Sequence, residues 1–288
     1  MIKARYSRSL PGNKAECLLC PHQCIIPDGA TGICRVRHNK GGIIYSLTYG
    51  KISALHSDPI EKKPLYHFFP GSQILSAGSV GCNFRCSFCQ NCEISQSALS
   101  EYPYIKNLTP AGLAELASVT PSNLGLAYTY NEPIVNYEFV IETARHITEK
   151  GLKNVMVTNG YINEEPLHEL LRYTDAWNVD LKGFSDDFYR EYTGGKLTPV
   201  LHTLKTIREE NKHLEITTLI IPGLNDDERT FNDMTVWIAS ELGKETVLHL
   251  SRYFPRYKMN IASTPLKTLE NLQSIALQKL RHVYLGNI

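Results

Sequence analysis

The last two thirds of this 288-residue sequence contain no cysteine, because all eight cysteines lie between Cys17 and Cys92. Disulfide scaffolds are usually short and secreted, so thiols gathered in one part of a long chain favour metal binding instead. Residues 1–14 also lack a continuous apolar segment, and we therefore expect no secretory signal and a cytoplasmic protein.

Long apolar runs and an excess of one charge are absent as well. No stretch approaches the roughly 18 apolar residues of a membrane span, so we expect no membrane partner. The formal net charge is only +1 and there is no long basic run. Sequence-independent binding of nucleic acid needs clustered Lys and Arg, so we expect no nucleic-acid partner. A low-complexity tract and a short internal repeat are missing too.

Three cysteines form the most informative motif in the chain. Cys82, Cys86 and Cys89 have C-x3-C-x2-C spacing and directly follow the apolar run Ile74–Val80. Three thiolates on one loop can hold three corners of a cubane iron–sulfur cluster and leave the fourth iron open to a substrate or cofactor. Structural zinc sites favour paired C-x2-C knuckles, which fit this spacing poorly. Cys92 follows at x2, so a closed four-cysteine cluster in an electron-transfer or scaffold protein stays open as an alternative.

This spacing resembles that of the radical S-adenosylmethionine (SAM) enzymes. The resemblance implies a [4Fe–4S] cluster whose fourth iron is chelated by the methionine amine and carboxylate of SAM. It further implies an oxidoreductase-like enzyme that cleaves SAM reductively to a 5′-deoxyadenosyl radical, which abstracts a hydrogen atom. The resemblance also implies a reductant such as ferredoxin or flavodoxin, and it implies anaerobic conditions.

From about residue 74 onward, short apolar runs alternate with helix-length segments, which indicates a parallel sheet with helical crossovers. The expected strands are Ile74–Val80, Leu124–Tyr130, Asn154–Thr158, Ala176–Lys182, Leu214–Ile221, Val247–Ser251 and His282–Leu285. Six or seven units are too few for an eightfold barrel. We therefore expect an α/β fold with a partial (βα)6 TIM-like barrel over residues 73–288, which is also the radical SAM fold.

Polar residues accumulate where these strands end, and chemistry in barrels of this class sits at that edge. Asp180 and Lys182 are two residues apart and face one side, so they form an internal ion pair or bind the charged groups of SAM. Glu132 precedes a proline at a strand end and is expected to take the SAM ammonium. Asn159 is either a ribose contact or a turn residue, and His249 is either a SAM contact or a core histidine. Phe88, beside the last cysteine of the motif, is expected to pack near the cluster or adenine.

Further segments sharpen the resemblance. Thr158-Asn159-Gly160, Asp180-Leu181-Lys182 and Ile221-Pro222-Gly223 are similar to segments of the glycyl-radical-enzyme activases, such as pyruvate formate-lyase activating enzyme. Those enzymes usually carry Gly-Gly-Glu-Pro where this chain has Tyr130-Asn131-Glu132-Pro133. That variant resembles the radical SAM member of the AmmeMemoRadiSam system, as do the segments Asp58–His67 and Ser251-Arg252-Tyr253. Where that family has an aromatic residue after Gln-Asn, this chain has Cys92.

A second cysteine group lies near the start of the chain. Cys17, Cys20, Cys24 and Cys34 are spaced by x2, x3 and x9 residues. Four thiolates suit a structural zinc ion or a second iron–sulfur cluster, and the spacing does not decide between them. We therefore predict a small cysteine-rich, metal-binding domain over residues 1–72, ahead of the barrel.

The sequence thus predicts a radical SAM enzyme that acts on an unknown protein, peptide or metabolite. Activation of a glycyl-radical enzyme is the main alternative within that class.

Overall fold

The computed structural model describes all 288 residues and is built around one eight-stranded sheet. The strand order is β16-β15-β14-β13-β12-β11-β9-β8, and neighbours from β9 to β16 are parallel. Only the edge strand β8 runs antiparallel to β9. The strands are β8 (Ala54–Pro59), β9 (Gln73–Gly78), β11 (Asn123–Tyr128), β12 (Lys153–Thr158), β13 (Ala176–Asp180), β14 (His213–Ile220), β15 (Val247–Arg252) and β16 (Val283–Gly286).

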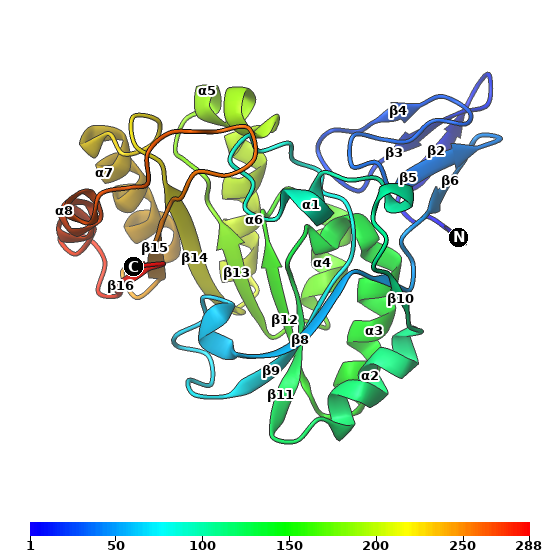
Figure 1. Cartoon of the computed structure of the whole chain (residues 1–288), viewed down its shortest axis with the longest axis horizontal. Helices are drawn as coiled ribbons and strands as arrows, with labels where there is room; N and C mark the ends of the chain where they lie inside the picture. The colour runs from blue at the N-terminus through cyan, green and yellow to red at the C-terminus, as the bar shows by residue number, and fades with distance from the viewer.

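Six helices connect the seven parallel strands, so the predicted partial barrel with six strand–helix units is confirmed. They are α2 (Pro110–Val119), α3 (Tyr137–Glu149), α4 (Glu164–Leu171), α6 (Leu197–Glu209), α7 (Glu228–Trp237) and α8 (Leu266–Ala276), and they lie along the outside of the curved sheet (Figure 1). Thr109 caps α2 by accepting the Gly112 N–H, and Asp227 caps α7 in the same way from Thr230. None of the helices combines the length and the apolar character that a membrane crossing requires.

Small antiparallel sheets make up the first fifty residues and lie beside the barrel (Figure 1). One has the order β1-β6-β5 and another β2-β3-β4, while β7 pairs with β10 from a later loop. Their strands are β1 (Ile2–Lys3), β2 (Ser7–Leu10), β3 (Lys14–Cys17), β4 (Ile25–Ile26), β5 (Arg37–Lys40), β6 (Ile43–Ser46), β7 (Lys51–Ile52) and β10 (Lys106–Asn107).

Residues 60–68 fill the barrel where its strands begin. Ile60 and Leu65 are fully buried in one apolar cluster with residues of β9, β11, β12 and β13. The backbone N–H groups of Tyr66 and His67 donate to the carboxylate of Glu215, the third residue of β14. This segment and β8 therefore belong to the barrel, although they precede residue 72, where we predicted the domain boundary.

Candidate active site

The loop that carries the cysteine motif follows β9, at the edge where the parallel strands end. Backbone hydrogen bonds fix the loop: Gly81 N–H donates to Ile94 O at 2.9 Å, and Arg85 N–H to Thr193 O at 2.8 Å. Within the loop, Phe84 N–H donates to the Cys82 sulfur at 3.3 Å. These contacts fix the backbone that carries the three cysteines.

One cavity of about 260 Å³ collects all the residues predicted to contact the first cluster or SAM except His249. Its wall contains Cys82, Cys86, Phe88, Cys89, Glu132, Asn159, Asp180 and Lys182. The last four come from the ends of β11, β12 and β13 or from the loops that follow them. The convergence of strand ends predicted from the sequence is therefore present, with His249 as the exception.

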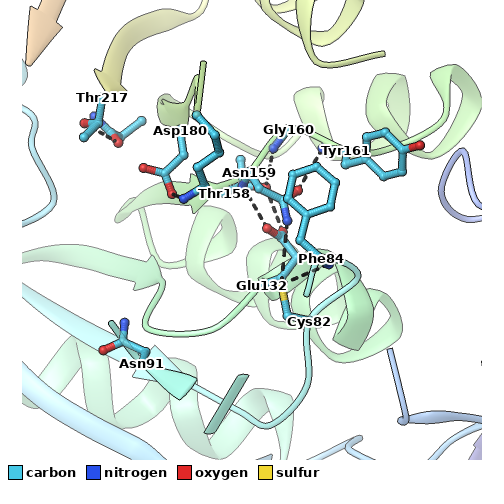
Figure 2. A network of polar contacts seen from close by, with 12 residues as sticks. Cys82, Phe84, Asn91, Glu132, Thr158, Asn159, Gly160, Tyr161, Asp180 and Thr217 are labelled. Carbon is cyan, nitrogen blue, oxygen red and sulfur yellow. Dashed lines mark hydrogen bonds and ion pairs between the residues drawn. The ribbon is translucent and has the colours of Figure 1, made fainter. Parts of the chain in front are cut away.

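Glu132 is the most tightly held acid in the cavity. Its carboxylate accepts the Thr158 hydroxyl at 2.7 Å and the backbone N–H groups of Asn159 at 2.8 Å and Ile134 at 3.1 Å (Figure 2). Burial raises the pKa of Glu132 to about 7, against the opposing effect of these donors. A buried carboxylate fixed by three donors is ready to receive a cation such as an ammonium group.

Asp180 and Lys182 form the ion pair that their spacing predicts, with Lys182 Nζ 2.7 Å from Asp180 Oδ2. Burial alone would lower the pKa of Lys182, but Asp180 and the nearby Cys86 outweigh it and raise the pKa. Both side chains are partly exposed and line the cavity, so they can bind an amino-acid group of either charge.

Asn159 connects the end of β12 to the cysteine loop. Its side-chain amide donates to Asn83 Oδ1 at 2.8 Å and lies 3.7 Å from the Cys82 sulfur (Figure 2). Its own side-chain oxygen accepts the Tyr161 N–H two residues further on, which is an Asx-turn contact, so Asn159 both forms the turn and contacts the cysteine loop. Phe88 is buried, with its ring centroid 6.0 Å from that of Phe188.

Burial opposes ionisation of the three thiols in the cysteine loop. Burial raises the pKa of Cys86 to about 12, and burial likewise raises the pKa values of Cys82 and Cys89. Metal binding requires the thiolate, so a cluster bound here must displace these protons.

His249 does not line the cavity, and our expectation of a SAM contact there is not supported by its position. Its Nε2 instead hydrogen-bonds Glu215 Oε2 at 2.6 Å, and His213 Nε2 is 2.9 Å from the other oxygen. Burial would raise the pKa of Glu215, but hydrogen bonds from both histidines and from the Tyr66 and His67 N–H groups lower it to about 2. His249 is thus a core histidine beside the segment that fills the start of the barrel.

Tyr130 is a cavity residue that the sequence did not single out as a site. Its φ is +71°, a left-handed conformation that favours glycine. Its hydroxyl donates to Asp58 at 2.6 Å, and the buried Lys63 bonds the same carboxylate oxygen at 2.7 Å. An added Cβ at Gly78 would lie 3.0 Å from the Tyr130 Cβ, so this glycine makes room for the tyrosine. The Tyr-Asn-Glu-Pro segment thus carries an aromatic ring that Asp58 holds in place.

Cys92 begins the short helix α1 (Cys92–Ser95) and is absent from the cavity wall. Its neighbours Asn91 and Ser95 do line the cavity, and the Asn91 amide donates to Tyr130 O at 2.8 Å. The arrangement favours three cavity-facing thiols over four, which is the donor set that leaves one iron open.

The second cysteine group also gathers around one cavity, between the small sheets and the barrel. Cys17, Cys20, Cys24 and Cys34 all line it, together with His22, Arg37 and Asn83. No three cysteine, histidine or acidic side chains, here or in the cysteine loop, converge in the way that a single metal ion requires.

Comparisons with known proteins agree with this geometry. A model of the radical SAM superfamily matches residues 77–234, from β9 into α7. The chain belongs to the radical SAM superfamily. It is therefore an enzyme of the radical SAM class, for which the family implies a [4Fe–4S] cluster and SAM. The three cavity thiols, the fixed carboxylate and the Asp180–Lys182 pair are a donor set that fits both groups.

Relatives of this radical SAM chain include an uncharacterized protein of Methanocaldococcus jannaschii, 43% identical over 100% of this chain and 86% of that protein. The pyruvate formate-lyase 1-activating enzyme of Escherichia coli is 25% identical over 51% of this chain and 61% of its own length. Among solved structures, a radical SAM methyltransferase from Sphaerobacter thermophilus has a TM-score of 0.58 at 13% identity, covering 76% of this chain and 67% of that one. At that identity the likeness speaks for the fold alone.

Proposed function

We propose that the main cavity binds a [4Fe–4S] cluster and SAM for hydrogen abstraction from a protein, peptide or small metabolite. The proposed cluster ligands are Cys82, Cys86 and Cys89. The proposed SAM contacts, which share the cavity wall with them, are Phe88, Glu132, Asn159, Asp180 and Lys182. The observation that carries the proposal is the convergence of three thiols, two carboxylates and one ammonium group in one cavity.

Each residue has a distinct task in this proposal. Bound together, the cluster and SAM supply a 5′-deoxyadenosyl radical for hydrogen abstraction. Glu132, already held by three donors, orients the SAM ammonium without having to reorganise. Lys182 has its charge available for the SAM carboxylate, and Asp180 fixes the position of Lys182.

Reductive cleavage of SAM tests the proposal. Anaerobically reconstituted protein, reduced with dithionite, should convert SAM to methionine and 5′-deoxyadenosine, measured by liquid chromatography. Cys86→Ala should abolish the product, while Cys92→Ala should keep it, because Cys92 does not line the cavity. A wild-type protein with a full cluster and no cleavage would refute the proposal. Loss of the cluster in Cys92→Ala would instead support a closed four-cysteine site.

Activation of a glycyl-radical enzyme is the second candidate, supported by the likeness to the Escherichia coli activating enzyme over half of this chain. Incubation with a glycyl-radical enzyme, SAM and a reductant should then produce a glycyl radical that electron paramagnetic resonance detects. The same assay with a partner whose glycine is replaced by alanine is the control.

For catalysis in the cell we propose a one-electron donor such as ferredoxin or flavodoxin, anaerobic conditions and a cytoplasmic location. The motivation is the oxygen sensitivity and electron demand of a reduced iron–sulfur cluster. Replacement of dithionite by a reduced flavodoxin in the cleavage assay checks the electron donor.

A further inference from the structure

Asn131 immediately precedes Glu132, and its side chain contacts the start of the cysteine loop. Its Oδ1 accepts the Ser79 N–H at 2.8 Å, and its Nδ2 donates to Gly81 O at 2.9 Å. Gly81 is the residue directly before Cys82. The same Nδ2 lies 3.3 Å from the backbone oxygen of Glu132. One amide side chain therefore joins the backbone that leads into the cysteine motif to the backbone that carries the Glu132 carboxylate.

The far end of the cysteine loop contacts the same segment. Asn91, two residues after Cys89, donates its side-chain amide to Tyr130 O at 2.8 Å. All three cysteines of the motif lie between Gly81 and Asn91 in sequence. Residues 130–132 are thus bonded to the loop before its first cysteine and after its last. A shift of this segment relative to the cysteines would break hydrogen bonds at both ends.

The backbone beside Asn131 is strained. The φ of Tyr130 is +71°, and the Asn131 N–H donates across it to Thr129 O at 3.0 Å. A hydrogen bond between residues i and i+2 around a positive φ is the rare, strained form of the γ-turn. Such strain persists only where surrounding contacts fix it, and it is concentrated at ligand-binding and active sites. The turn is therefore a second observation that points to a functional role for this segment.

The position of Glu132 relative to the cysteines matters under the proposed function, because one SAM molecule contacts the open iron and this carboxylate together. A site of this kind needs its groups held to within about 0.5 Å by supporting contacts. The three donors to the carboxylate come from Thr158, Asn159 and Ile134, outside the cysteine loop. Asn131 supplies the direct connection between the Glu132 segment and the backbone next to Cys82.

We propose that Asn131 is a positioning residue, which fixes the Glu132 carboxylate relative to the three cluster cysteines so that one SAM molecule reaches both. The proposal rests on the proposed function, since it requires that the cavity binds SAM. Asn91 supports the same segment from an exposed position and contributes less.

A SAM titration of Asn131→Ala tests this role, because alanine removes both hydrogen bonds to the cysteine loop and leaves every proposed ligand in place. Reconstituted, dithionite-reduced protein would be titrated anaerobically while the electron paramagnetic resonance signal of the cluster is recorded. The variant should keep the wild-type iron content and bind SAM about 10-fold more weakly, which is the effect of about one hydrogen bond. At saturating SAM, the change in its signal should be smaller than in the wild type.

Asn163→Ala is the matched control. Asn163 is also partly buried and donates its side-chain amide to a backbone oxygen, that of Leu18, at 2.7 Å, but it does not line the main cavity. Its removal should lower the free energy of unfolding and leave SAM affinity and the SAM-induced signal unchanged. An asparagine with a merely structural role would behave like Asn163 in all three measurements.

Equal SAM affinity and an equal signal change in Asn131→Ala and the wild type would overturn the proposal. A wild-type protein that holds its cluster and does not respond to SAM would refute the proposed function instead.

Asn91→Ala serves if Asn131→Ala cannot hold iron. The Asn91 side chain is exposed, so its removal should leave the iron content unchanged and weaken SAM binding about 2- to 3-fold. Wild-type SAM binding in Asn91→Ala, together with loss of iron in Asn131→Ala, would mean that these contacts serve the cysteine loop alone and would equally overturn the proposal.

Discussion

Substitution of Gly81 by alanine should weaken the contact between the amino-terminal cysteine site and the cysteine loop of the barrel. Gly81 is buried and has a φ of +94°, and an added Cβ would meet Cys34 O and a Val36 methyl group, each at 2.8 Å. Gly71 supplies a matched control, because its φ is +81° and nothing lies within 4 Å of an added Cβ. The two variants share the backbone cost and differ in the steric one.

The structure sets the size of the difference. A left-handed conformation costs a residue other than glycine about 1–2 kcal/mol, which is the whole effect expected for Gly71→Ala. Overpacking adds about 1–3 kcal/mol, so Gly81→Ala should lose about 2–5 kcal/mol in total. Gly81→Ala loses more stability than Gly71→Ala because the backbone atoms of Cys34 cannot rotate away from the new methyl group as a flexible side chain can.

Two anaerobic measurements compare the Gly81→Ala and Gly71→Ala variants. Urea unfolding monitored by circular dichroism gives the free energy of unfolding, and a chelator challenge gives the rate of iron loss. Gly81→Ala should fall below Gly71→Ala in stability and lose iron faster. Equal values for the two variants would refute the view that the cysteine loop and the amino-terminal site are packed rigidly together.

Three further substitutions probe the cavity and the barrel. Glu132→Gln should lower SAM affinity about 10- to 100-fold in a calorimetric titration, because the amide lacks the charge and turns an NH2 group toward existing donors; an unchanged affinity would contradict the proposed ammonium contact. The pKa of Glu215 is lowered to about 2, so its contribution of about 3 kcal/mol is complete above pH 4.5 and is lost as the pH falls toward 2. Glu215→Gln should therefore lower the free energy of unfolding at pH 7, and that free energy should fall less steeply below pH 4.5 than in the wild type. An equally steep fall in the variant would argue against a role of Glu215 ionisation in stability. In Gly195→Ala the new Cβ would lie 2.3 Å from the Phe84 ring in the cysteine loop, so iron binding should drop, whereas Gly194→Ala, with open space around it, should keep its iron.

The barrel was predictable because its strands are buried on both faces. Asn154–Thr158, for example, is an expected strand that matches β12 (Lys153–Thr158) to within one residue. Continuous apolar runs and helix caps such as Thr109 are local signals, and local signals can be read from sequence. The antiparallel pairing of β8 with β9 joins two strands that are more than ten residues apart in sequence, and the segment between them has no local pattern that predicts the pairing.

The sequence predicted which residues line the cavity better than it predicted which side chains those residues contact. The cysteine spacing and the polar strand ends identify the cavity wall, since parallel strands bring their ends together. The sequence leaves His249 open between a SAM contact and a core histidine, because its partner Glu215 on the neighbouring strand lies 34 residues away in sequence. The contact between Cys34 and Gly81 likewise joins segments that only the folded chain brings together.

The left-handed backbone of Tyr130 has a consequence for the edge of the sheet. Glycine would adopt this conformation without strain, so tyrosine bears a cost of about 1–2 kcal/mol that its side chain must offset through Asp58. Tyr130 also lines the cavity, so this strained backbone position is part of the cavity wall. Because Asp58 belongs to β8, the hydrogen bond from Tyr130 ties the antiparallel edge strand of the sheet to the wall of the cavity.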